Sequence, residues 1–496
     1  MTHTADFAPV RRRAGILLHP TSIPAAQGPL GTPARRWVDF LARAGISVWQ
    51  MLPVGPTHED NSPYQSLSAH AGNPDFINLD DLVVRGWLSE SDLETFTEPA
   101  QRGALFSMAA EVFFREIERG ASSYTNAYRQ FRAENEEWLE NYAVFSAVRE
   151  LHGGQPWTKW PGPLRDREEP AMEAFRQENQ TRLSRVRFEQ FLFQLQWSDL
   201  CRYAAEKGVA LFGDVPFFVA HDSAEVWQYR SQFKLAPDGN PLVVAGVPPD
   251  YFAPEGQHWG NPIYNWSAMA SDGFSWWSAL LATQARRFEL IRLDHFRGLE
   301  ACWEIPADDP HPINGRWVPG PGHRFLDACF RSLPSLNLVA ENLGVIGTEV
   351  EQLREAFGLA GMVVLQFAFD QNPANPHLPH NHRLGDVVYS GTHDNNTTVG
   401  WYGALTTEAR CGIRDYGFNS AEAIHRLTIR MAFQSVAQLA VIPLQDVLGL
   451  DQAARMNVPG TAQGNWSWKF DWNDLSKDVS DQIRHLVLLY GRFSQV

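Results

Sequence analysis

The sequence has little cysteine, no long apolar run, and fewer basic than acidic residues. Its four cysteines, Cys201, Cys302, Cys329 and Cys411, are far apart in 496 residues and show no CxxC spacing. This pattern is typical of reduced thiols in a cytosolic protein, not of a disulfide framework. No stretch approaches the roughly 20 apolar residues of a membrane span, and the basic N-terminal cluster lacks the apolar run of a signal peptide. We therefore expect a soluble, cytoplasmic protein.

The charge balance excludes some partners. The chain has 42 Lys and Arg against 57 Asp and Glu, a formal net charge of −15. This argues against nucleic acid or an anionic membrane as the main partner, whereas a neutral ligand meets no such repulsion. Many of the 18 tryptophans lie beside Gly, Pro, Asn and His, as in "GQHWGNPIYNW" (256–266). They are either ordinary packing or flat stacking surfaces for a ligand with apolar faces and polar edges. For the oligomeric state we expect a monomer or a simple homodimer.

Short apolar runs that end in polar residues recur along the chain. Because they are hydrophobic almost without interruption, they predict strands covered on both faces. Helical patterns lie between most of them, so the sequence predicts an α/β fold, a (β/α)₈ TIM barrel. The eight predicted strands lie within 14–24, 47–56, 209–219, 289–298, 337–344, 362–369, 386–395 and 438–449.

The spacing of these runs predicts large insertions. We expect the barrel to begin within 14–80, a mostly helical insertion subdomain to span 81–205, and the rest of the barrel to occupy 206–496. Residues 236–266 are dense in Gly and Pro, and a loop that long is expected mainly where it serves function. Fewer than fifty residues follow residue 449, too few for a C-terminal β-sandwich domain.

Charged and polar side chains follow four of the predicted strands. Because the strand ends of a parallel barrel share one rim, these side chains should converge there. One aspartate alone is often a turn former or a helix cap, but four carboxylates and an arginine from four strands indicate an active site. The set is Asp214, then Arg292 with Asp294 and His295, then Glu341, then His393 with Asp394.

Retaining glycoside chemistry would use such a set. It needs a nucleophilic carboxylate and an acid/base carboxyl about 5–5.5 Å apart. Arg292 shares a strand face with Asp294, so we expect it to lower the pKa of Asp294. Glu341 follows the apolar "NLVA", so we expect it to keep its proton near neutral pH. Asp394 remains as a third anion that can bind sugar hydroxyls.

A metal-dependent hydrolase on the same barrel is the competing interpretation, since His and Asp are also metal ligands. The first predicted strand offers only His19, however, and no HExxH motif or Cys/His cluster occurs. The residues therefore favour metal-free chemistry.

Several long motifs resemble motifs of one protein family and occur in the same order as in that family. "FGDVPFFVAHDSAEVW", "GVPPDYFAPEGQHWGNPIYNW", "RLDHFRG", "VAENLG", "SGTHDNNTT" and "RMNVPGTAQGNWSW" are similar to motifs of the amylomaltase (4-α-glucanotransferase) family of the α-amylase clan. The resemblance implies transfer of α-1,4-glucan segments between maltooligosaccharides through a β-glucosyl-enzyme. It also implies that no metal or organic cofactor is needed.

The resemblance assigns roles to matching positions. Asp294 matches the nucleophile, Glu341 the acid/base and Asp394 the stabiliser of the transition state, and 236–266 matches the family's lid loop. The remaining substrate-binding positions are Arg292, Asp214 and His393 around the donor sugar, Tyr64 as its stacking platform, and Ser62, Gln257, Trp259 and Asn465 in neighbouring subsites.

The chain also departs from the family pattern. Asn342 and Asn396 stand where the family often has Asp, and "HED" (58–60) replaces Gly-Tyr-Gly before Ser62. The two lost carboxylates are expected to affect the pH profile. Two alternatives use the same residues: an α-glucan hydrolase, with water as acceptor, and a glucan-binding protein that has lost catalysis.

Overall fold

The computed structural model describes residues 12–94, 101–249, 255–418, 421–461 and 463–493. Eight parallel strands form one sheet in the order β10-β11-β12-β1-β2-β3-β6-β9. The Ala340 N–H donates to the Ala360 carbonyl at 2.8 Å, which joins the two edges and closes the barrel. The strands are β1 (Arg13–Leu17), β2 (Val48–Gln50), β3 (Ala210–Val215), β6 (Leu290–Leu293), β9 (Leu338–Ala340), β10 (Met362–Val364), β11 (Val387–Tyr389) and β12 (Leu439–Pro443).

All eight predicted strands are confirmed, and alternation along them explains their composition. Phe212, Val339 and Val441 belong to a core cluster inside the barrel. Ile291 and Leu338 belong to the larger cluster between the strands and the helices. Because successive side chains enter different cores, the strands are apolar at almost every position.

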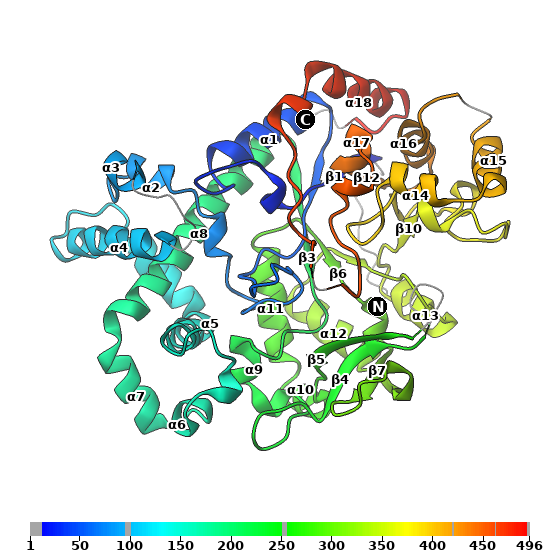
Figure 1. The fold of residues 1–496 in the computed structure, drawn as a ribbon. Coiled ribbons are helices and arrows are strands. Elements are labelled where there is room, and N and C mark those ends of the chain that lie inside the picture. The colour runs from blue at the N-terminus through cyan, green and yellow to red at the C-terminus, as the bar shows by residue number, and fades with distance from the viewer. Residues whose placement is uncertain (1–11, 95–100, 250–254, 419–420, 462, 494–496) are drawn as a thin grey trace.

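Helices surround the barrel and fill the long insertion. Figure 1 shows the insertion helices gathered on one side of the barrel, beyond α8. The insertion contains α2 (Asp80–Val84), α3 (Glu90–Glu94), α4 (Arg102–Glu118), α5 (Thr125–Leu151), α6 (Gly162–Arg165), α7 (Glu169–Glu178) and α8 (Gln180–Glu206). The other helices are α1 (Thr32–Arg43), α9 (Ala224–Gln228), α10 (Trp266–Ser271), α11 (Ser275–Ala285), α12 (Gly322–Ser332), α13 (Thr348–Ala356), α14 (Thr398–Ala404), α15 (Thr407–Tyr416), α16 (Ile424–Gln434), α17 (Leu444–Leu448) and α18 (Lys477–Leu489).

Helix α8 holds the loop after β2 through two glutamines. Gln190 and Gln196 each accept from the N–H and donate to the C=O of one loop residue, Gly72 and Asn78 respectively. These amide pairs imitate the pairing between strands. The insertion therefore fixes the loop after β2, which also contains Tyr64.

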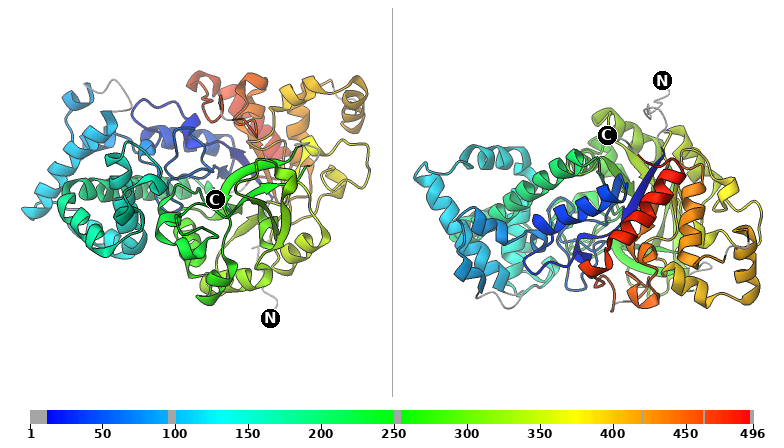
Figure 2. Two further views of the ribbon diagram at one scale, coloured as in Figure 1. Left: turned by 60° about the horizontal axis from the view of Figure 1, so that its bottom comes forward. Right: turned by 90° about the horizontal axis from the view of Figure 1, so that it is seen from above.

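A second sheet was not predicted from the sequence. It is antiparallel, in the order β5-β4-β7-β8, and lies beside the barrel (Figure 2). Its strands are β4 (Val243–Val247), β5 (Gln257–Pro262), β7 (Ala301–Pro306) and β8 (Arg316–Pro319). Two of these strands lie in the predicted lid loop, 236–266, of which residues 250–254 fall outside the described part. Within the described ranges, no helix is both long and apolar enough to cross a membrane.

Candidate active site

Strand alternation places the charged residues at the barrel mouth. Phe212 and Val339 face the barrel interior, so Asp214 and Glu341, two residues further on, follow on the same side. Arg292 lies level with Asp214 across the β3–β6 pair. The predicted convergence of residues from different strands therefore occurs.

Arg292 links two carboxylates. Its Nη1 donates to both oxygens of Asp214, at 2.8 and 2.7 Å, and its Nη2 lies 2.9 Å from Oδ1 of Asp294. Arg292 and Asp214 are buried, whereas 27% of the Asp294 side chain is exposed. The pair with Asp214 orients the guanidinium, and Asp294 is the carboxylate that a ligand can reach.

Glu341 is fixed beside Asp294 through the backbone. Its Oε2 accepts the N–H of His295, the residue after Asp294, and its Oε1 accepts the N–H of Leu343, each at 2.8 Å. His295 has φ 44°, an uncommon conformation that brings this N–H to the glutamate. Burial, reinforced by Asp294, raises the pKa of Glu341 to about 7, although Arg292 and the two N–H groups oppose the rise. We expected Glu341 to keep its proton near neutral pH, and the upward shift of its pKa agrees with this.

Arg292 lowers the pKa of Asp294, as expected, but burial and neighbouring carboxylates outweigh this effect. Burial, with Asp214 and Asp394 nearby, raises the pKa of Asp294 to about 6, and Arg292 offsets only part of this. The predicted convergence of carboxylates at the rim thus also contributes to the raised pKa of Asp294. The 2.9 Å contact with Arg292 favours the ionised form of Asp294, while burial favours the protonated form of Glu341.

Asp394 is held in its ionised form by neighbours. His393 Nε2 lies 3.3 Å from its Oδ2, and the Asn457 amide donates to its Oδ1 at 2.6 Å. Burial alone would raise the pKa of Asp394, but His393 and Asn457 bring it well below its usual value. Arg455 donates to the Asp394 carbonyl at 2.6 Å. Sequence reasoning missed Asn457 and Arg455, because "RMN" gives no signal that it reaches a strand end sixty residues earlier.

Three aromatic rings line the wall beside these carboxylates. Tyr64 stacks on His393 with ring centroids 5.2 Å apart and planes inclined by 18°, and its hydroxyl donates to Asp214 at 2.8 Å. Trp466 lies 6.0 Å from both rings and has φ 62°, again an uncommon backbone conformation. Trp466 was missed from the sequence, where it looked like one aromatic among many. The rings form a rigid surface of the kind that sugars stack on.

The remaining predicted positions lie around this centre. Trp259 packs edge-on against His295 at 4.8 Å, and its Nε1 donates to Gln257 Oε1 at 3.1 Å. The N–H of Ser62, two residues before Tyr64, donates to its own loop, to Asp60 Oδ1 at 3.0 Å. Asn465, next to Trp466, accepts the N–H of Val458 at 3.0 Å. Ser62 and Asn465 are therefore placed by local turns, and their contact with a ligand stays a prediction.

The two substituted positions have local structural roles. Asn342 donates to Glu351 at 2.7 Å and accepts the N–H of Met362 at 2.7 Å, so it joins β9 to α13 and β10. Asn396 accepts the N–H of Thr397 at 2.9 Å. Neither substitution removes one of the three carboxylates.

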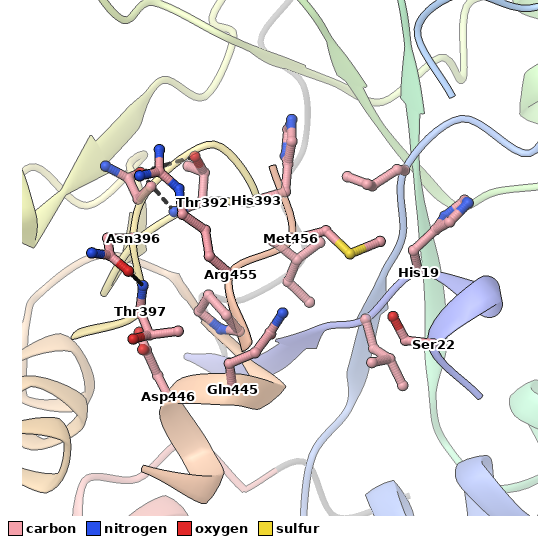
Figure 3. Close-up of a pocket in the computed structure, with 15 residues that line it drawn as sticks. His19, Ser22, Thr392, His393, Asn396, Thr397, Gln445, Asp446, Arg455 and Met456 are labelled. Atoms are coloured by element: carbon pink, nitrogen blue, oxygen red, sulfur yellow. Dashed lines mark hydrogen bonds between the residues drawn. The ribbon is translucent and has the colours of Figure 1, made fainter. Parts of the chain in front are cut away.

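A pocket borders the site at His393, which is one of the residues that line it (Figure 3). His19, Gln445, Asp446 and Met456 are among the residues that line it. Burial, and to a smaller degree His393, lowers the pKa of His19 to about 3, so this imidazole is neutral. The Asp446 carboxylate accepts hydrogen bonds from Ser390 and Thr398, so it fixes both ends of the loop that contains Asp394. Within the described ranges no three His, Cys, Asp or Glu side chains are grouped to hold a metal ion.

Comparison with known proteins identifies the family of the chain. A family model described as 4-alpha-glucanotransferase matches residues 18–475. The chain is 44% identical to a 4-alpha-glucanotransferase of Thermus thermophilus over 96% of this chain and 98% of that one. It is 42% identical to a 4-alpha-glucanotransferase of Synechocystis over 97% of this chain and 98% of that one. An amylomaltase structure from Streptococcus agalactiae, in complex with acarbose, superposes with a TM-score of 0.93 at 34% identity, covering 98% of this chain and 100% of that chain. The chain therefore belongs to the 4-alpha-glucanotransferase family.

Proposed function

We propose that the protein transfers α-1,4-glucan segments between maltooligosaccharides by a retaining double displacement. One observation carries this proposal. Asp294 lies beside Arg292, and the N–H that follows Asp294 binds Glu341, with pKa values of about 6 and about 7 for the two carboxyls. An ionised nucleophile next to a protonated acid is the pair that the first step requires.

In the first step an Asp294 oxygen attacks C1 of the donor sugar. The bond from C1 to the glycosidic oxygen breaks, and Glu341 gives its proton to that oxygen as the leaving chain departs. In the second step Glu341 takes the proton of an acceptor 4-hydroxyl, whose oxygen forms a bond to C1 as the Asp294 ester breaks. A pKa of about 7 lets Glu341 serve first as acid and then as base near neutral pH.

The other residues position the donor sugar. Asp394, kept ionised by His393 and Asn457, accepts hydrogen bonds from ring hydroxyls as the sugar approaches an oxocarbenium ion. The Tyr64 ring supports the sugar face, and its hydroxyl bond to Asp214 fixes the ring plane. Arg292 remains paired to Asp214, so it stays in place while Asp294 changes charge.

Transfer in place of hydrolysis requires that water be excluded while a sugar hydroxyl enters. Trp259 on β5 stands edge-on against His295, and the buried Nε2 of His295 has no hydrogen-bond partner in the described structure. We assign this pair to the first acceptor sugar, with Gln257 as its neighbour, and Ser62 and Asn465 to the adjoining subsites. An acceptor stacked there would displace water from the ester before it reacts.

The four cysteines are free thiols, in agreement with a reducing cytoplasm. We place the protein there, acting on starch- or glycogen-derived chains without a metal or organic cofactor.

The test is incubation of the purified protein with maltotriose, with separation of products by chain length. We expect longer maltooligosaccharides and free glucose without a rise in total reducing ends, and no reaction for Asp294→Asn. A rise in reducing ends without longer products would show hydrolysis. Sugar binding without turnover would show a glucan-binding protein.

A further inference from the structure

The four-stranded sheet carries an exposed aromatic patch. Trp303 on β7 and Trp317 on β8 are register partners, and their rings meet edge to face with centroids 5.2 Å apart. Trp317 is 37% exposed, although tryptophan is usually covered. Two other large apolar side chains near this corner, Ile313 and Val345, are 64% and 53% exposed. An apolar patch of this kind on a soluble chain indicates a ligand or partner surface.

The tryptophan pair is rigid. Trp303 Nε1 donates to the Pro312 carbonyl at 2.8 Å, which holds the turn that precedes β8. The Arg297 guanidinium lies 3.7 Å from the centroid of the Trp317 ring, in a cation–π contact. Arg297 and Trp303 together cover part of the Trp317 ring, and the rest of its surface is exposed. A ring fixed in this way loses little conformational freedom when a ligand stacks on it.

The patch is connected to the catalytic loops. Arg297 follows Asp294 by three residues, and its Nη1 donates to the carbonyl of Val345, which follows Glu341 by four residues. One side chain thus joins the turn after the nucleophile, the loop after the acid/base and the Trp317 ring. The patch therefore lies beside the loops that follow both carboxyls.

The chemistry of the patch selects a neutral, amphipathic ligand. Aromatic faces accept the apolar face of a pyranose, and the carboxylate of Glu300, which lies 3.5 Å from the Arg297 guanidinium, can accept hydrogen bonds from hydroxyls. The chain's net charge of −15 does not oppose an uncharged ligand.

We propose that Trp317, with Trp303 behind it, is an outer binding site for the distal part of a long α-1,4-glucan whose reacting bond lies between Asp294 and Glu341. The inference rests on the proposed function, because the occupant is the same substrate. The patch raises the affinity for amylose or glycogen chains and contributes nothing to short maltooligosaccharides that end inside the cleft.

The test compares long and short substrates in Trp317→Ala. We expect KM for amylose to rise about three- to tenfold, the range of one aromatic contact, while kcat and the disproportionation of maltotriose stay unchanged. Trp317→Phe keeps a ring above Arg297, so its KM for amylose should lie between the values of the wild type and of Trp317→Ala. Phe418→Ala is the matched control, since Phe418 is 89% exposed and lies on the C-terminal side of α15.

Binding is measured separately, by affinity electrophoresis in gels containing glycogen with Asp294→Asn as the parent protein. The glycogen gel should retard Trp317→Ala less than the parent protein. It should retard Phe418→Ala as much as the parent. Equal losses on amylose and maltotriose, or no loss on either, would overturn the outer site, as would a change of elution volume in gel filtration without a change in glycogen retardation. Failure of the wild-type protein to disproportionate maltotriose would instead refute the proposed function.

Discussion

Replacement of Glu341 by glutamine should stabilise the protein, and only at higher pH. Glu341 is 9% exposed, and burial raises its pKa from the ordinary value of 4.5 to about 7. The folded protein therefore binds this proton more tightly than the unfolded chain does. Stability falls as pH rises from about 4.5 to about 7, as the carboxylate is forced to ionise in a dry site.

The magnitude follows from the size of the shift. A rise of roughly 2.5 pKa units corresponds to about 3 kcal/mol of lost stability above pH 7, and to almost none at pH 4. The side-chain amide of glutamine carries no charge at either pH, so Glu341→Gln avoids this loss. The amide has only one accepting oxygen for the N–H groups of His295 and Leu343, which costs about 1 kcal/mol at every pH.

The assay is thermal unfolding of both proteins at pH 4.5 and pH 8 at one scan rate. For 496 residues the unfolding entropy is about 1 kcal/mol per kelvin. The Tm of Glu341→Gln minus the Tm of the wild type should therefore be about 3 °C higher at pH 8 than at pH 4.5. Glu349→Gln, at an exposed site on α13, is the matched control. A difference between variant and wild type that does not change with pH would refute the assigned pKa and its cause.

Three further predictions concern activity. The profile of kcat/KM against pH should be bell-shaped, falling below about 6 as Asp294 gains a proton and above about 7 as Glu341 loses its own; a plateau extending to pH 9 would contradict these roles. Asn457→Ala should lower kcat/KM about tenfold, mainly through kcat, because a hydrogen bond to the charged Asp394 is worth about 1.5 kcal/mol or more; an effect confined to Tm would leave Asn457 a purely structural residue. Tyr64→Phe should lower kcat/KM about fivefold by loss of one hydrogen bond, and Tyr64→Ala much more by loss of the platform; equal activities of these two variants would show that the ring supports no sugar.

The barrel was predictable because its strands carry a local signal. Each strand is buried on both faces, so runs such as "VALFGDV" and "NLVAEN" are recognisable, and the residues after them must share a rim. The three carboxylates were found in this way. Their neighbours Arg292 and His393 lie within two residues of them, so they were found as well.

The antiparallel sheet carried no comparable signal. Segments such as "QHWGNP" and "RWVP" are short and contain Gly or Pro, and their hairpins join into one sheet only where β4 pairs with β7, far along the chain. The same distance in sequence concealed Asn457 and Trp466, which meet Asp394 and Tyr64 only once the barrel has closed.

The central claim is that Asp294 forms a covalent bond to the donor sugar. The direct measurement is to trap this ester with a fluorinated α-glucosyl fluoride that slows its breakdown, followed by peptide mapping by mass spectrometry. We expect one added glucosyl group on the peptide that contains Asp294 and none on Asp294→Asn. A label on another carboxylate, or turnover with inversion at C1 and no label, would contradict it.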